Sequence, residues 1–254
     1  MKIVVCCKIV PDEELIKVLP NRELSFAEVP VKISQYDLNA LEEGKRLATE
    51  TQGTLLALSL GSNEVLESSK IRKDVLSRGV DELYLVVDDA HKYADSLESA
   101  KALATALKEI GEYDLVLCGV GSGDLYAQQV GNQLGTLLDL PTVNNVTAIK
   151  QSGALLEIER TLESAVETLE VAMPAVVSVS SEINIPAVPS MRDIMRAGKK
   201  PINELSPDLS AVKPSLEIVE QLAPQQQERR MQIVEGDGEE AVNQLVQFLK
   251  KEIL

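Results

Sequence analysis

The sequence predicts an α/β fold with a doubly wound, mainly parallel sheet of the Rossmann-like kind. Between residues 1 and 140, short apolar runs alternate with longer segments of helical periodicity. The apolar runs are rich in Val, Leu and Ile without polar alternation, which is typical of strands covered on both faces. Glycines stand directly after several helical segments, where a helix would end.

These patterns place strands and helices in alternation along the first part of the chain. Strands are predicted at residues 2–8, 54–61, 82–87 and 113–119. Helices are predicted at residues 36–51, 63–79, 95–111 and 125–139. Leucines at helical spacing support the first helix, and Asp37 is expected to be its N-cap.

The pattern changes after Pro141, where strands follow one another without helices between them. They are predicted at residues 142–150, 154–162, 166–173 and 175–183, and the Gln-Ser-Gly sequence at 151–153 reads as a hairpin turn. We expect these strands to extend the same sheet with antiparallel members.

From Pro201 onward the composition shifts to Pro, Gln, Glu and Ser, and helical periodicity returns only near the end of the chain. Residues 201–235 are therefore interpreted as an extended arm and residues 238–252 as a helix. The chain divides into a nucleotide-binding α/β domain at 1–200 and an arm with its helix at 201–254. Because the arm has little core of its own, we expect it to lie on a partner surface.

The composition excludes several classes of function. The net charge of −15 argues against nucleic acid or an anionic membrane as a partner, since both require a basic surface. No stretch approaches the roughly 18 apolar residues of a membrane span, and the apolar run at the N-terminus is too short for a signal peptide. The three cysteines form no Cys-x-x-Cys or disulfide pattern, which favours a reducing cytoplasm. His91, the only histidine, stands in a polar segment that is expected to be a solvated loop, which argues against a triad or a His-based metal site.

Three strand ends are candidate parts of one binding site. Cys6 to Lys8, Leu60 to Ser62 and Gly119 to Asp124 each follow a predicted parallel strand. Ligands of doubly wound sheets bind at the carboxyl ends of the strands, so these segments are expected to converge on a pocket. The glycine loop at 119–124 is expected to lead into a helix at Asp124, an arrangement that brings backbone N–H groups to a phosphate.

The glycine loop fits neither of two common phosphate motifs. Asp124 stands where Gly-x-Gly-x-x-Gly requires glycine, and the Gly-Lys-Ser/Thr of a P-loop is missing. A plain strand-to-helix turn that needs glycine for its backbone angles remains an alternative. Ser34 to Asp37 are likewise either simple caps of the first helix or part of the site.

A segment after the last predicted strand is a candidate docking surface. It contains several prolines, Met191 and a short basic helix in a strongly acidic protein. A solvated loop is one interpretation. Docking of a partner is the other, because flexible Met side chains suit adaptable contacts.

Together, these motifs resemble the β subunit of electron transfer flavoproteins, especially the FixA-like branch. The resemblance spans about residues 1–205 and rests on the order of the motifs: Cys7-Lys8 after the first strand, "SQYDLNALEEGKRL", "SLG", "GVGSGDLYAQQVG" and "MPAVVSVSSEINIPAVPSMRDIMRAGKKPI". It implies the adenine nucleotide alpha hydrolase-like form of the fold.

The resemblance implies a nucleotide pocket and a docking loop in this chain. Its cofactor-binding positions would be Cys6, Ser34, Gln35, Tyr36, Asp37, Leu60, Gly119, Val120, Gly121, Ser122, Gly123, Asp124, Leu125, Tyr126, Ala127, Gln128, Gln129 and Val130. Its docking residues would be Pro189, Met191, Ile194 and Met195.

The implied function is electron transfer without an acid, base or nucleophile of its own. The chain would form a heterodimer with an α subunit that holds the working FAD, and would relay electrons from acyl-CoA dehydrogenase-like donors to a quinone-linked acceptor. Housekeeping β subunits hold AMP in the pocket, whereas the bifurcating branch holds a second FAD. Here Ser34-Gln35 replaces the Asn-Pro of the family, Thr161 replaces a usual Glu, and both ligands remain open.

Two other functions remain as alternatives. A stand-alone regulator of the universal-stress kind would hold ATP or AMP at the same sheet edge but would not need the arm. A NAD-dependent enzyme is disfavoured by the spacing of the glycines and by the shortage of acid-base candidates.

Overall fold

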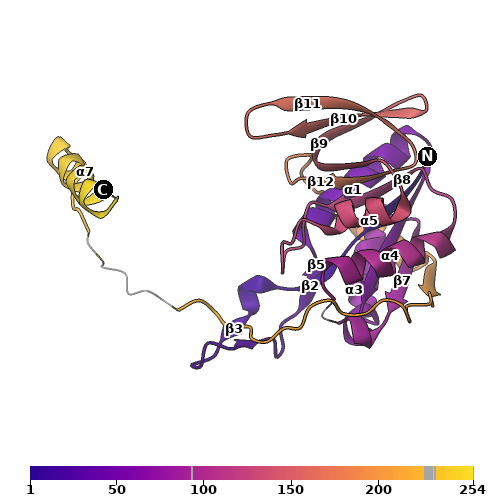
Figure 1. Ribbon diagram of the computed structural model, residues 1–254, viewed down its shortest axis with the longest axis horizontal. Coiled ribbons are helices and arrows are strands. Elements are labelled where there is room, and N and C mark those ends of the chain that lie inside the picture. The colour runs from indigo at the N-terminus through magenta and orange to yellow at the C-terminus, as the bar shows by residue number, and fades with distance from the viewer. Residues whose placement is uncertain (93, 226–230, 232, 254) are drawn as a thin grey trace. The chain divides into compact units, whose positions relative to one another are not determined.

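The computed structural model describes residues 1–92, 94–225, 231 and 233–253 (Figure 1). Their contacts divide the chain into two units. The first comprises Met1–Lys17 with Ser25–Glu220, and the second comprises Val18–Leu24 with Gln221–Leu254. The candidate site lies entirely in the first unit.

The first unit is built on a mixed sheet with the strand order β11-β10-β9-β12-β8-β1-β6-β7-β13. Its strands are β1 (Lys2–Cys6), β6 (Thr54–Gly61), β7 (Glu82–Val87), β8 (Leu115–Gly119), β9 (Thr142–Ser152), β10 (Leu155–Thr161), β11 (Val166–Ala172), β12 (Ala175–Val179) and β13 (Ile202–Leu205). The seven neighbouring strands β9-β12-β8-β1-β6-β7-β13 pair in parallel, and β10 is antiparallel to both of its neighbours, β9 and β11. This confirms the predicted doubly wound, mainly parallel sheet with added antiparallel strands.

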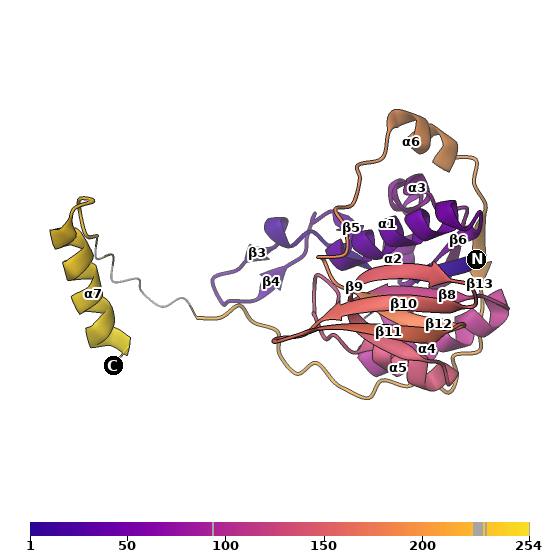
Figure 2. The same ribbon diagram turned by 90° about the horizontal axis from the view of Figure 1, so that it is seen from above.

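Helices cover both faces of the sheet. They are α1 (Gln35–Glu50), α2 (Asn63–Leu66), α3 (Ser69–Ser77), α4 (Ser96–Ile110), α5 (Val130–Leu138) and α6 (Met191–Ala197). Figure 2 shows α1, α3 and α6 on one side of the sheet and α4 and α5 on the other. Along β1, Ile3 and Val5 pack into the core on the α1 side, while Val4 and Cys6 pack into the core on the α4 side. Burial on both faces explains why the strands are continuously apolar.

Several boundaries differ from the predictions. The helix predicted at 63–79 is divided into α2 and α3. The helix predicted to follow Asp124 begins only at Val130, because Tyr126 and Gln128 adopt left-handed backbone angles with φ of 47° and 58°. The last of the strands after Pro141, β12, is parallel to both neighbours rather than antiparallel.

The segment after Pro201 also contains structure that the composition did not reveal. Ile202–Leu205 form the edge strand β13, which pairs in parallel with β7. Alternating exposure along this short strand leaves only a weak sequence signal.

Between β1 and α1 the chain makes an excursion that carries short strands. Here β2 (Ile9–Pro11) pairs with β5 (Val31–Ile33), and β3 (Lys17–Val18) pairs with β4 (Leu24–Ser25). A turn of 3-10 helix, η1, spans Glu13–Leu15, and a second, η2, spans Asp89–His91. The sequence pattern predicts no helix or strand at residues 9–33.

The second unit contains the long helix α7 (Glu239–Ile253), close to the helix predicted at 238–252. Apolar side chains at helical spacing lie exposed on it: Val242, Leu245, Val246 and Leu249. Elsewhere in this unit, Ala223 N donates a hydrogen bond to Arg22 O at 2.8 Å. Among the described residues of the whole chain, no helix has both the length and the apolar character needed to cross a bilayer.

Candidate functional site

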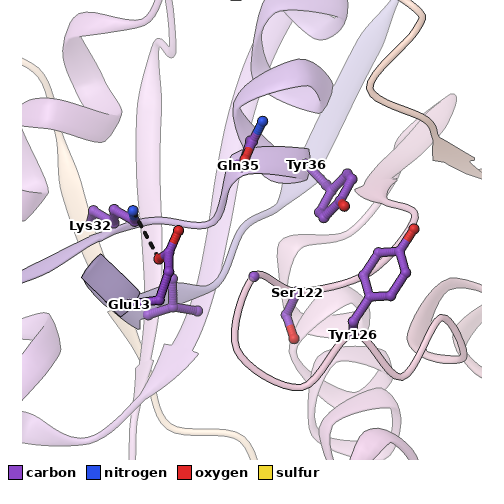
Figure 3. Close-up of a pocket in the computed structure, with 8 residues that line it drawn as sticks. Glu13, Lys32, Gln35, Tyr36, Ser122 and Tyr126 are labelled. Atoms are coloured by element: carbon purple, nitrogen blue, oxygen red, sulfur yellow. Dashed lines mark ion pairs between the residues drawn. The ribbon is translucent and has the colours of Figure 1, made fainter. Parts of the chain in front are cut away.

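A cavity of about 140 Å³ lies between the start of α1 and the loop that follows β8 (Figure 3). It is lined by Val10, Glu13, Lys32, Gln35, Tyr36, Ser122, Gly123 and Tyr126. Of the three strand ends expected to converge on a pocket, only the glycine loop lines this cavity, together with Gln35 and Tyr36 at the start of α1. Lining residues from β2, η1 and β5 were missed, because these elements are too short to show a periodic pattern.

The carboxylate of Asp37 connects the three elements beside the cavity. Its Oδ2 accepts a hydrogen bond from Lys8 N at 2.8 Å, and its Oδ1 accepts one from Gly119 N at 3.0 Å. The side chain thus joins α1 to the residues that end β1 and β8. The sequence predicted Asp37 as the N-cap of α1, and this prediction is wrong. Ser34 occupies that position, and its Oγ accepts a hydrogen bond from Gly123 N at 3.2 Å.

Burial raises the pKa of Asp37 to about 7, because a charge is costly away from water. The hydrogen bonds from Lys8 N and Gly119 N partly oppose this shift by stabilising the carboxylate. Asp37 therefore changes its charge near neutral pH while its oxygens remain bound to two backbone amides.

Gly119 is required here by close packing. A Cβ at this position would lie 2.6 Å from the Cβ of Tyr36 and 2.7 Å from Oδ1 of Asp37. Only glycine lets the end of β8 approach the first turn of α1 this closely.

An ion pair between Lys8 and Asp124 connects the residues that follow β1 to the glycine loop. Lys8 Nζ lies 2.6 Å from Asp124 Oδ2. Burial acts to raise the pKa of Asp124, but the charge and hydrogen bond of Lys8 outweigh it, and the pKa is lowered overall. Asp124 therefore anchors the loop and does not begin a helix.

Two tyrosine rings lie side by side at one end of the cavity (Figure 3). The ring centroids of Tyr36 and Tyr126 are 5.1 Å apart, and the rings are tilted by 31°. The pKa of Tyr36 is raised mainly by a hydrogen bond with Tyr126 and, to a smaller extent, by burial. A Cβ on Gly121 would lie 2.7 Å from Cδ2 of Tyr126, so glycine makes room for this ring. Such a pair offers an aromatic surface to a planar ligand.

At the other end of the cavity, Lys32 binds two carboxylates. Its Nζ lies 2.9 Å from Asp12 and 2.8 Å from Glu13, and these contacts lower the pKa values of both acids. Hydrogen bonds to Glu13 and Asp12 raise the pKa of Lys32 itself. Lys32 thus places a cation in the lining of the cavity, already paired with acids.

The remaining predicted site residues do not line the cavity. Cys6 is buried at the end of β1, where contact with Cys118 on β8 raises the pKa of its thiol. Leu60 packs against the core on the α4 side. The stretch from Leu125 to Gln129 is exposed. Gln129 precedes α5 and accepts a hydrogen bond from Ser96 Oγ at 2.9 Å.

Some backbone donors of the glycine loop already have partners inside the protein. Gly119 N binds Asp37, Val120 N binds Val179 O at 2.8 Å, and Gly123 N binds Ser34. Leu125 N and Tyr126 N bind Oγ and O of Ser122 at 3.4 Å and 3.0 Å. A phosphate would therefore find its donors among the remaining amides of the loop and in the first turn of α5, which begins at Val130.

The prediction that His91 lies in a solvated loop is wrong. Its side chain is buried at the end of β7, with Nδ1 3.0 Å from Asp88 and Nε2 3.4 Å from Glu98. The polar residues around His91 predicted exposure, but its ring is enclosed beside the carboxylates of Asp88 and Glu98. No cluster of three or more metal-ligating side chains was found among the described residues.

The predicted docking residues lie on and just before α6. Met191 and Met195 are each 74% exposed, and Ile194 is 42% exposed. The helix begins with a capping box in which Ser190 and Asp193 bind each other's backbone N–H groups. This segment therefore presents apolar side chains from an ordered backbone.

A family model described as "Electron transfer flavoprotein domain" matches residues 24–210. The chain belongs to the electron transfer flavoprotein family. The match includes the start of α1, the glycine loop and α6, and it confirms the family on which the sequence resemblance rests. Membership in the electron transfer flavoprotein family supports electron transport with a flavin and association with a partner of the same family.

The buried carboxyl of Asp37 predicts a specific pH dependence of stability. Its pKa rises from 3.8 to about 7 on folding, so the folded protein binds this proton more tightly. The resulting stabilisation is fully present below about pH 4 and is lost as the pH rises through about 7, with a span of a few kcal/mol. The D37N variant lacks this carboxyl, so its contribution to the pH dependence should disappear. The free energy of unfolding of D37N should therefore decrease less between pH 4 and 7 than that of the unaltered protein. Denaturant titrations at several pH values measure it, and D237N, at an exposed site, is the control. An unchanged pH slope in D37N would contradict the assignment.

Proposed function

We propose that this chain is the β subunit of a heterodimeric electron transfer flavoprotein of the FixA-like branch. Its α subunit would hold the working FAD, and the pair would relay electrons from acyl-CoA dehydrogenase-like donors to a quinone-linked acceptor. The observation that carries this proposal is the cavity between Tyr36 and the glycine loop, both of which lie in the part of the chain that matches the family. The match gives no support to a stand-alone universal-stress-like regulator.

We propose that the cavity holds the adenine nucleotide of this subunit, either AMP or a second FAD. Tyr36 and Tyr126 would bind a planar ring, and the free amides of the loop with the first turn of α5 would bind the phosphate. Asp37, Ser34 and Gly119 would act behind the site by holding the loop against α1. A flavin bound there would supply the electron-carrying chemistry, while the chain itself orients and shields it.

The nucleotide content of the purified heterodimer tests this proposal. The chain is co-expressed with its α subunit, the complex is denatured, and the released nucleotides are separated and counted. One FAD with one AMP per heterodimer indicates a simple carrier, and two FAD indicate the bifurcating type. Absence of any adenine nucleotide beyond that of the α subunit would contradict the pocket. A stable nucleotide-loaded homodimer would favour the stand-alone regulator.

The charge and the cysteines of the chain support proposals about its cellular location and its partners. We propose a cytoplasmic location, which is supported by Cys6, Cys7 and Cys118 being buried and free of disulfides. The net charge of −15 supports protein partners over nucleic acid.

We propose that the chain after Glu220 binds the α subunit. The exposed apolar side chains of α7 support this, because a helix with one apolar face is stabilised by covering that face. A chain that ends at Glu220 should retain the nucleotide pocket and bind the α subunit at least about tenfold more weakly. Titration of the purified α subunit, followed by calorimetry, measures the affinity. Unchanged affinity, with the fold intact by circular dichroism, would refute this role.

We propose that Met191 anchors partner dehydrogenases. It is 74% exposed on an ordered helix start, and truncation of such an anchor typically weakens binding about tenfold. M191A in the heterodimer should weaken binding of a purified acyl-CoA dehydrogenase without changing nucleotide content. V166A removes methyl groups from a side chain 62% exposed on β11 and is the matched control. Equal affinities of M191A and V166A would exclude the anchor.

A further inference from the structure

The segment between β12 and α6 exposes large apolar side chains although its backbone is held in place. Ile185 is 93% exposed and Val188 is 90% exposed, and Met191 follows shortly after. Exposed apolar loops without fixed contacts tend to collapse onto the nearest core. Here polar contacts with α1 hold the backbone instead, and Figure 2 shows the segment passing beside that helix.

The central contact is a reciprocal pair of side-chain amides. Asn39 on α1 is 2% exposed, and its Nδ2 donates to Asn184 O at 2.8 Å and to Asn184 Oδ1 at 3.2 Å. Asn184 Nδ2 returns a hydrogen bond to Asn39 O at 3.1 Å. Asn39 Nδ2 also lies 3.5 Å from Ser181 O. A buried amide that is satisfied in this way specifies one backbone arrangement, because any other would leave polar groups unpaired.

A second contact, three residues later, fixes the direction of the segment. Ala187 N donates to Glu42 Oε2 at 3.3 Å, and Glu42 lies on α1 close to one turn after Asn39. From the other side, Arg78 donates to Ala187 O at 3.4 Å. The backbone at 184 and 187 is therefore held by polar groups, while the side chains at 185 and 188 point away from the core.

We infer that Asn39 is a positioning residue for partner docking: through Asn184, it holds the segment 181–190 so that the apolar side chains through Met191 face the partner. This inference rests on the proposed docking function of Met191. Since Asn39 does not line the cavity, its role is separable from nucleotide binding.

The test uses the full heterodimer with N39A, N184A and the double variant. Hydrogen exchange of peptides covering residues 181–190 measures order in the segment, and titration of a purified acyl-CoA dehydrogenase measures docking. Each single variant should increase exchange and weaken binding by about tenfold, the usual effect of losing one or two hydrogen bonds. Only one of the hydrogen bonds joins the two side chains, and the others run to backbone oxygens that alanine keeps, so the double variant should be weaker than either single variant. Nucleotide content should not change.

Matched controls make the outcomes distinct. T49A alters an exposed residue on the same helix and should leave exchange and affinity unchanged. If N39A does not fold, N184A decides, since Asn184 is only partly buried. Weak binding by M191A with normal exchange and affinity in N39A or N184A would overturn the inference and leave the proposed docking function intact. If M191A binds normally, the docking function fails and the inference fails with it.

Discussion

The buried carboxylate of Asp37 is the interaction on which the site depends. It gathers the amides of Lys8 and Gly119, at the ends of the two central strands, onto the first turn of α1. These hydrogen bonds fix the end of β8 against the start of α1, the two parts of the chain between which the cavity lies. The price is a buried acid whose pKa rises to about 7. The protein keeps this costly group where two strands, a helix and a loop meet.

Helix α1 serves two surfaces. Its first turn carries Ser34, Tyr36 and Asp37 beside the cavity, and its next residues carry Asn39 and Glu42, which hold the segment before α6. The proposed nucleotide and the proposed dehydrogenase would thus be placed by one rigid element.

The sequence was sufficient for the sheet but only partly sufficient for the site. Continuous apolar runs and glycine stops follow from burial on both faces, so β1, β6, β7 and β8 were predicted almost residue by residue. Asp37 was misassigned because an Asp side chain can cap a helix or bind the backbone amides at strand ends, and the sequence does not distinguish the two roles. Lys32 and Glu13 were missed because β5 and η1 are only three residues long. His91 was misjudged because the polar residues beside it suggested exposure, although its ring is buried between the carboxylates of Asp88 and Glu98.

The glycine loop shows why a motif must be located before it is interpreted. Its glycines suggested phosphate contacts, yet Gly119 and Gly121 make room for Tyr36 and Tyr126, and Gly123 donates to Ser34. Because left-handed residues delay α5 until Val130, the free helix amides lie at the far end of the loop. A nucleotide with its ring at the tyrosine pair and its phosphate at α5 would therefore lie along the loop. Such a nucleotide would contact the exposed stretch from Leu125 to Gln129 rather than the glycines, which are used inside the protein.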